Sequence, residues 1–346
     1  MKTGTTSISR RFGNVIVLCG VLLTCLPSGA PAQTQMEEVV VRGRQPGPPL
    51  WRVSNGEHVL WILPLVPTVP REMIWDDDRV ASVIRDADAA IGSPDISVGV
   101  SKLVLLNPIN WIRGARLLKR VSANPGGATL EEVLPAPTYA RYAAMKARYF
   151  PKDEEIDELR PAFATGRISS AVLDAEQLTG SGIITKRVDK LIRRNRDARY
   201  TDITIEEQLE GSFSELRARI EALADSLPQD GEIACFEEQL TRFERHIDDM
   251  KMAANAWATG MARDMEDFAT TVGLQDPCAQ LLLGSSEADL LENLLARSTQ
   301  SWLDAAADAL ESNASTFSML PMVYITGDLS LTDRLAAMGY AVHRPN

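Results

Sequence analysis

Residues 50–63 read LWRVSNGEHVLWIL, in which two short apolar runs flank Ser54-Asn55-Gly56. Trp, Val, Leu and Ile fit strands, and an Asn-Gly pair between two such runs is typical of a tight turn. The stretch therefore predicts a β-hairpin. We expect Pro64, Pro67 and Pro70 to end its second strand, because proline has no backbone N–H to donate to a neighbouring strand.

Beyond the hairpin the pattern is mostly helical. Apolar residues recur three and four positions apart in 76–87, 130–150, 154–159, 169–178, 184–195 and most of 206–310. Short strands are predicted at Ala89–Ile91 and 316–325, and a helix at 331–338. We therefore expect one α/β (α+β) domain over residues 50–346. In it the N-terminal hairpin and the C-terminal strand share a mixed sheet, and the middle of the chain is helical.

The chain is acidic, with 36 Lys and Arg against 47 Asp and Glu and a formal net charge of −11 over 346 residues. A wholly disordered chain is excluded, because 45% of the residues are hydrophobic. An acidic body repels phosphate backbones, so nucleic acid is not an expected partner. The basic stretch at 186–196 is interpreted as the solvated side of a helix, because Val188, Leu191 and Ile192 form one apolar face.

The first 32 residues have the order of a secretory signal peptide. A cationic start ends at Arg10-Arg11, an apolar run follows at 15–26, and Ala30-Pro31-Ala32 fits a signal-peptidase site. We expect cleavage after Ala32 and a periplasmic or secreted protein. The apolar run is shorter than the ~20 residues that a membrane span needs, and cleavage would remove it. We therefore expect no stable membrane span in the mature protein. Lipidation of Cys25 and twin-arginine export are disfavoured alternatives.

A proline-rich linker is predicted over residues 33–49. Within it, residues 37–44 resemble the TonB box that opens outer-membrane receptors. An accessory role in outer-membrane transport is therefore an alternative function, although a solvated arm is the simpler interpretation.

Signal cleavage removes Cys19 and Cys25 and leaves Cys235 and Cys278. In an oxidising compartment two remaining cysteines favour a disulfide. Closing this loop of about 43 residues would stabilise the fold by ~4 kcal/mol in the chain-entropy treatment. A metal-binding pair is the alternative, but it needs further ligands, and no histidine lies at the usual zinc spacing.

The common catalytic motifs are missing from the sequence. It contains no GxSxG, SxxK, GxGxxG, GxxxxGK[ST] or HExxH. Nothing in the chain therefore points to a known nucleophile elbow, phosphate loop or dinucleotide fingerprint.

Weaker motifs nevertheless occur in a defined order. After the hairpin come Ala87-Asp88-Ala89, Thr204-Ile205-Glu206-Glu207-Gln208, Arg297 on a long predicted helix, and Gly339-Tyr340-Ala341-Val342. In this order and spacing the chain, from Leu50 to its C-terminus, resembles the TraB/GumN family.

The resemblance implies a site made of two GxxH motifs and a Glu after the second strand. In that family and in the related Tiki-type proteases these groups would hold a divalent metal and activate its water. Reading without gaps, the first motif falls on 64–67 with Pro67 at the ligand position, and the second on 321–324 with Tyr324 there. The Glu corresponds most nearly to Ser93. Proline has no ligand atom, and neutral Tyr and Ser hold a divalent ion poorly.

The glycines of both motifs are also replaced, by Pro64 and Pro321. Proline fixes φ near −65° and removes an N–H, so both turns are expected to be reshaped. We predict no catalytic residue, no metal and no cofactor, which makes the chain a pseudoenzyme. The three histidines are expected to be surface or packed residues: His58, His246 and His343.

The remnant of the cleft is predicted to comprise Pro67, Ser93, Arg297 and Tyr324. Arg297 would bind an anionic group or pair with a carboxylate of the acidic body. We expect an exported, non-catalytic binding or scaffold protein whose partner is an unidentified protein or small molecule. The alternative is a hydrolase or peptidase in which Tyr324 acts as acid or base beside Arg297.

Overall fold

The computed structural model describes residues 46–262, 275–327 and 329–345. The chain divides into two units, Met1–Gly43 and Arg44–Asn346, and every described residue belongs to the second. The predicted signal peptide, Cys25, residues 37–44 and the rest of the linker up to residue 45 therefore lie outside the described residues.

The packed body begins within the segment predicted as linker. Gly47, Pro48 and Pro49 are buried. Gly47 has φ +75°, and a Cβ at this position would lie 2.3 Å from the backbone oxygen of Asp76, so only glycine fits here. The packed domain therefore begins at least three residues before Leu50, the predicted start.

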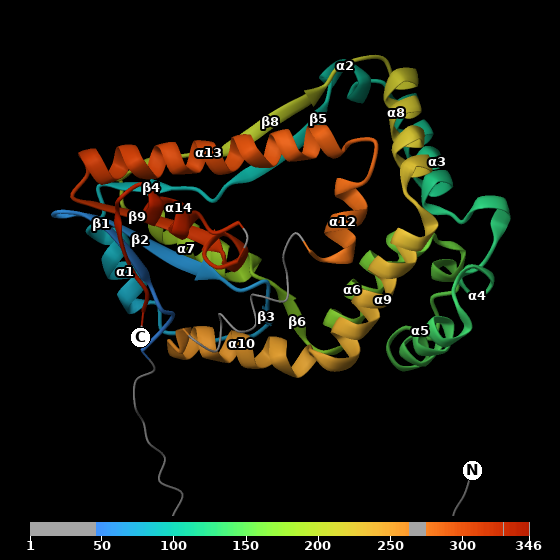
Figure 1. The fold of residues 1–346 in the computed structure, drawn as a ribbon, viewed down its shortest axis with the longest axis horizontal. Coiled ribbons are helices and arrows are strands. Elements are labelled where there is room, and N and C mark those ends of the chain that lie inside the picture. The colour runs from blue at the N-terminus through green and yellow to red at the C-terminus, as the bar shows by residue number, and fades with distance from the viewer. Residues whose placement is uncertain (1–45, 263–274, 328, 346) are drawn as a thin grey trace, which may run out of the picture. The chain divides into compact units, whose positions relative to one another are not determined.

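The largest sheet is mixed and has six strands in the order β10-β1-β2-β9-β4-β7. Its strands β1, β2, β4 and β9 are labelled in Figure 1. Parallel pairing joins β2 to β9, β9 to β4 and β4 to β7, whereas β1 pairs antiparallel with β2 and β10. The strands are β1 (Trp51–Asn55), β2 (His58–Leu65), β4 (Ala89–Ile91), β7 (Arg199–Thr201), β9 (Ser315–Pro321) and β10 (Ala341–His343). The hairpin and the C-terminal segments share one sheet, as the sequence predicts.

The β1–β2 hairpin closes through a two-residue loop, with Asn55 opposite His58 and Gly56 at φ +59°. The second strand is longer than predicted, because β2 continues through Pro64 to Leu65. The partner β1 begins at Trp51, opposite Ile62, so Pro64 lies beyond the end of β1. Its missing N–H therefore costs no hydrogen bond on that side.

Two small strand pairs extend from this sheet. β3 (Thr68–Pro70) pairs antiparallel with β6 (Leu178–Gly180), and β5 (Asp95–Val100) pairs in parallel with β8 (Thr204–Leu209). Because β5 follows β4 and β8 follows β7, the second pair prolongs the β4–β7 edge beyond the sheet.

Helices form most of the rest, as predicted. The α-helices are α1 (Asp78–Arg85), α2 (Lys102–Leu105), α3 (Pro108–Ser122), α4 (Leu130–Val133), α5 (Ala136–Tyr149), α6 (Pro161–Ala175), α7 (Gly182–Ile192), α8 (Phe213–Ser226), α9 (Gln229–Arg245), α10 (Ile247–Thr259), α12 (Pro277–Leu283), α13 (Ala288–Ser312) and α14 (Leu331–Ala337); the 3₁₀ turns are η1 (Pro125–Gly127), η2 (Glu155–Glu158) and η3 (Met322–Tyr324). Within the described ranges no helix is both long and apolar enough to cross a bilayer.

Several predicted boundaries are wrong. The helix expected at 130–150 is two helices, because Pro135 caps the start of α5 and a proline inside a helix would clash with the preceding turn. The strand expected at 316–325 ends at Pro321 and continues as η3. Residues 95–129, for which the sequence pattern predicts no element, form β5, α2, α3 and η1.

Buried side chains in the described ranges form two large clusters and one small one. The largest surrounds the six-stranded sheet and includes Trp257 and Trp302. A second cluster, around Tyr142 and Phe236, fills the space among α4, α5, α6 and α9. The third contains only Leu117, Val121 and Ala224, from α3 and α8. The basic stretch at 186–196 behaves as predicted, because Val188 and Ile192 are buried in the first cluster.

Candidate site at the strand ends

The two degenerate motifs lie side by side. In the parallel pairing of β2 with β9, Pro64 is opposite Leu320 and Leu65 is opposite Pro321. On the other side of β9, Ile91 is opposite Ser318. Segments 64–67, 321–324 and 92–94 therefore leave the sheet at the same edge, the carboxyl ends of three adjacent strands. Ligand sites of open α/β sheets usually occupy this edge.

The predicted residues at this edge differ in exposure. Pro67 is exposed, whereas Ser93 and Tyr324 are half-buried. The Ser93 hydroxyl donates a hydrogen bond of 2.6 Å to the carbonyl of Met319, which ties the end of β4 to β9. Tyr324 is the last residue of η3, and its ring packs against the main core.

Buried hydrogen bonds fix the backbone on both sides of the edge. Trp257 Nε1 of α10 donates to the carbonyl of Pro64 at 2.7 Å. Directly after Tyr324, the carbonyl of Ile325 accepts from Ser330 Oγ at 2.9 Å and from Thr332 Oγ1 at 2.8 Å. These bonds satisfy buried acceptors and set where the two motif turns lie.

Burial raises the pKa of Tyr324, and the carboxylate of Asp95 raises it further. The phenol is therefore neutral at neutral pH and offers a hydrogen-bond donor and acceptor rather than an anionic oxygen. Asp95 was not identified from the sequence as a site residue. Its position two residues after Ser93, at the start of β5, could have indicated it.

The guanidinium of Arg297 forms an ion pair with another side chain of the protein. Its helix α13 leads into β9 through Asn313 and Ala314, and Trp302 Nε1 donates to Ser318 Oγ at 3.2 Å. Arg297 lies five residues earlier on α13, about 7.5 Å from Trp302 along the helix axis. However, its Nη1 is 3.5 Å from Glu207 Oε2 of β8, and its side chain is half-exposed. The guanidinium thus pairs with a carboxylate, one of its two predicted roles.

The histidines do not substitute for the missing ligands. His58 lies at the opposite end of β2, with Nδ1 2.7 Å from the carbonyl of Asn313. His246 Nδ1 is 2.7 Å from Asp249 Oδ2, and His343 lies on the edge strand β10. In the part of the chain that the structure describes, no three His, Cys, Asp or Glu side chains gather into a metal-binding group. The donor set at the strand ends does not fit a divalent metal.

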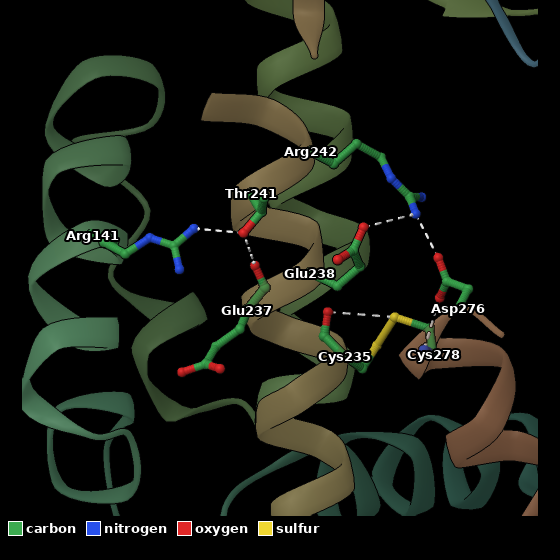
Figure 2. Close-up of polar contacts among 8 residues, drawn as sticks. All are labelled: Arg141, Cys235, Glu237, Glu238, Thr241, Arg242, Asp276 and Cys278. Carbon is green, nitrogen blue, oxygen red and sulfur yellow. Dashed lines mark hydrogen bonds and ion pairs between the residues drawn. A yellow bond between two sulfur atoms is a disulfide. The ribbon is translucent and has the colours of Figure 1, made fainter. Parts of the chain in front are cut away.

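The predicted disulfide between Cys235 and Cys278 is present, with a Cα–Cα distance of 4.5 Å, and it joins α9 to α12 (Figure 2). Beside it, Arg242 Nη2 of α9 lies 2.5 Å from Asp276 Oδ2, and the other oxygen of Asp276 accepts from the backbone N–H of Cys278 at 2.8 Å. Covalent and ionic contacts therefore fix the same helix junction.

The family described as TraB/PrgY/gumN matches residues 49–344. The match runs from two residues before β1 to the residue after β10. Searches of curated proteins and of solved structures gave no significant match.

Proposed function

The chain belongs to the TraB/PrgY/gumN family, and from that premise we propose that it is an exported member that binds a protein or small-molecule ligand without catalysing a reaction. The observation that carries the proposal is the register of β2 and β9. Positions 64–67 and 321–324 adjoin at one edge of the sheet, yet they present Pro67 and Tyr324 where the family resemblance implies histidines.

The chemistry of these side chains supports binding rather than metal-assisted hydrolysis. A hydrolytic metal needs ligands that are anionic or imidazole, and one open position for water. Pro67 offers no donor atom, Ser93 uses its hydroxyl proton on the Met319 carbonyl, and Tyr324 is held neutral by its raised pKa. What remains is a sheet edge held by hydrogen bonds, with hydroxyl groups that can bind a ligand.

The rival, a hydrolase that uses Tyr324 and Arg297, is less well supported. A general base acts best when its pKa lies near the working pH, and the pKa of Tyr324 is moved away from that range. Arg297 is already paired with Glu207. If an activity is found, Tyr324→Phe and Arg297→Ala should each abolish it under the rival mechanism, and unaffected rates would remove that mechanism.

The first test is metal analysis of purified protein, with a peptidase assay in the presence and absence of chelator. We expect no stoichiometric metal and no chelator-sensitive cleavage. Stoichiometric zinc, cobalt or manganese together with chelator-sensitive cleavage would overturn the non-catalytic proposal.

A second test restores the ligands. The triple variant Pro67→His, Ser93→Glu, Tyr324→His should gain cobalt binding visible as a d–d absorption band, because three adjacent strand ends would then present two imidazoles and a carboxylate. The matched control is Pro67→Ala, Ser93→Ala, Tyr324→Phe, which should bind none. If the restored variant folds but takes up no more cobalt than the control, the assignment of these positions to an erased metal site is wrong.

Export is a separate part of the proposal and rests on residues 1–32. N-terminal sequencing of protein from the periplasm or medium should begin at Gln33. An uncut chain retained in the cytoplasm would contradict it. The transport-accessory alternative is tested by deleting residues 33–45 and asking whether pull-down of outer-membrane proteins is lost.

A further inference from the structure

Residues 96–130 have a charge opposite to that of the whole protein. They contain five cations and no Asp or Glu, in a chain where acids outnumber bases by 47 to 36. The cations are Lys102, Arg113, Arg116, Lys119 and Arg120, four of them on α3. A local positive patch on a negative body gives the protein one face that anionic surfaces attract.

The same stretch exposes large apolar side chains. Trp111 is 67% exposed and Leu118 62%, and Ile109 and Ile112 are each more than half exposed. Single exposed apolar residues are ordinary on a protein surface, but several on one helix indicate a binding surface. A tryptophan among them is typical of side chains that lie at a membrane–water boundary.

Among the described residues, α3 is only partly covered. The helix packs on α8, beside it in Figure 1, and its buried contacts there are Leu117 and Val121 against Ala224. Trp111 and Leu118 lie on one side of that seam and line an apolar groove of about 340 Å³, whose other wall includes Phe213 and Ile220 of α8.

Three arginines lie on the other side of the seam. Arg113, Arg116 and Arg120 line, together with Arg217 of α8, a shallow hollow of about 820 Å³. Glu221 of α8 forms ion pairs with two of these arginines, at 2.6 Å from Arg120 and 3.2 Å from Arg217. Arg113 and Arg116 are exposed. We call the exposed part of α3, with Trp111 and Leu118 on one side and Arg113, Arg116 and Arg120 on the other, the basic apolar face.

We infer that the basic apolar face docks the protein on an anionic lipid bilayer. The arginines would bind lipid phosphates, and Trp111 and Leu118 would enter the boundary between headgroups and acyl chains. A helix with cations on one side and Trp and Leu on another lies in the interface plane in this way. Docking adds a location to the proposed function and does not depend on it.

A second copy of this chain is a poorer occupant. A two-fold dimer places the same patch on both subunits, so the arginines of α3 would face one another and repel. A nucleic acid would use the cations but offers no apolar surface to Leu118 or to the exposed part of Trp111. The bilayer satisfies both chemistries at once.

The test is vesicle co-sedimentation of the chain that lacks residues 1–32, which keeps every described residue and removes the apolar signal segment. We expect at least tenfold more binding to vesicles of equal phosphatidylglycerol and phosphatidylcholine than to phosphatidylcholine alone. Binding should fall strongly in about 0.5 M salt, because salt screens charges near a surface. The emission of Trp111 should shift to the blue on the anionic vesicles, and the shift should be lost in Trp111→Phe.

The decisive variant is Arg113→Gln, Arg116→Gln, which should bind about 30-fold more weakly if each cation contributes roughly 1 kcal/mol at the surface. Its matched control is Arg79→Gln, Arg85→Gln, which removes the same charge from exposed positions of α1 and should bind as the parent does. Matching circular dichroism and unfolding temperatures establish that both variants are folded.

Three results would overturn the inference. One is equal binding to neutral and anionic vesicles, or none to either. Another is an equal loss of binding in the α3 variant and the α1 control. The last is a dimer, seen by light scattering, that Trp111→Ser dissolves, which would assign the face to a second copy of the chain.

Discussion

Replacing Arg160 by methionine should expose how strongly a buried ion pair constrains the helical region. Arg160 precedes α6, and its side chain is only 12% exposed, while that of Glu232 on α9 is 2% exposed. The guanidinium bonds the Glu232 carboxylate and also donates to the carbonyl of Ala224 in α8 at 2.7 Å. One side chain therefore connects three helices.

The magnitude follows from the stranded carboxylate. Burial already raises the pKa of Glu232 from 4.5, and Arg160 works against that rise. Without Arg160, the Glu232 carboxyl can avoid being a buried charge by binding a proton. At pH 7 this protonation costs at most 1.36 × (7 − 4.5), about 3.4 kcal/mol, relative to the unfolded chain. Part of this penalty is already present in the parent, where the pKa of Glu232 is raised, but the variant also removes the hydrogen bond to the Ala224 carbonyl, worth about 1 kcal/mol. We expect Arg160→Met to cost about 3 kcal/mol at pH 7.

The sign of the pH dependence is fixed by the same group. Because the folded-state pKa of Glu232 lies above its unfolded value of 4.5, the folded state binds the proton more tightly, and this group's contribution to stability declines as pH rises above 4.5. The variant raises that pKa further, so its deficit should grow from pH 5.5 to pH 7. At pH 5.5 the same limit is about 1.4 kcal/mol. This pH lies above the sequence pI of about 4.9, which keeps the protein charged.

The assay is urea unfolding followed by circular dichroism at both pH values. Arg167→Met is the matched control, because Arg167 lies on the same helix α6 but pairs at the surface with Asp153 and Glu155. It should cost less than about 1 kcal/mol. Adding Glu232→Gln to Arg160→Met should recover stability at pH 7. A loss below 1 kcal/mol, a deficit independent of pH, or no recovery in the double variant would refute the reasoning.

Three further predictions concern the sulfur bridge and the strand ends. Replacing Cys235 and Cys278 by serine should lower the free energy of unfolding by about 4 kcal/mol. Two free thiols in the denatured, unreduced parent protein that lacks residues 1–32 would contradict the bridge. Trp257→Phe removes the hydrogen bond to the Pro64 carbonyl and should cost about 2 kcal/mol by urea unfolding, whereas a neutral result would show that bond to be unimportant. Tyr324 should ionise only above pH 10 in ultraviolet difference titration, so Tyr324→Phe should lower the number of tyrosines that ionise above pH 10 by one; if Tyr324→Phe instead removes an ionisation below pH 10, its ring is not desolvated.

Local patterns in the sequence determined much of this protein. The hairpin follows from Asn55-Gly56 between two apolar runs, because turn geometry is set by neighbouring residues. The disulfide follows from elimination, since only Cys235 and Cys278 remain after the predicted cleavage. Likewise the helical middle follows from apolar spacing. An interrupting proline such as Pro135 shifts boundaries without changing the class of fold.

The tertiary structure alone decided how distant segments meet. Apolar periodicity says that β2 and β9 are buried but not that Leu65 lies opposite Pro321, a pairing across about 250 residues that places the two degenerate motifs together. It also decided that Arg297 meets Glu207, and that α3 keeps Trp111 exposed. Sequence patterns record which side chains avoid water. Which partner covers them, and which are left uncovered, depends on the packing of the whole chain.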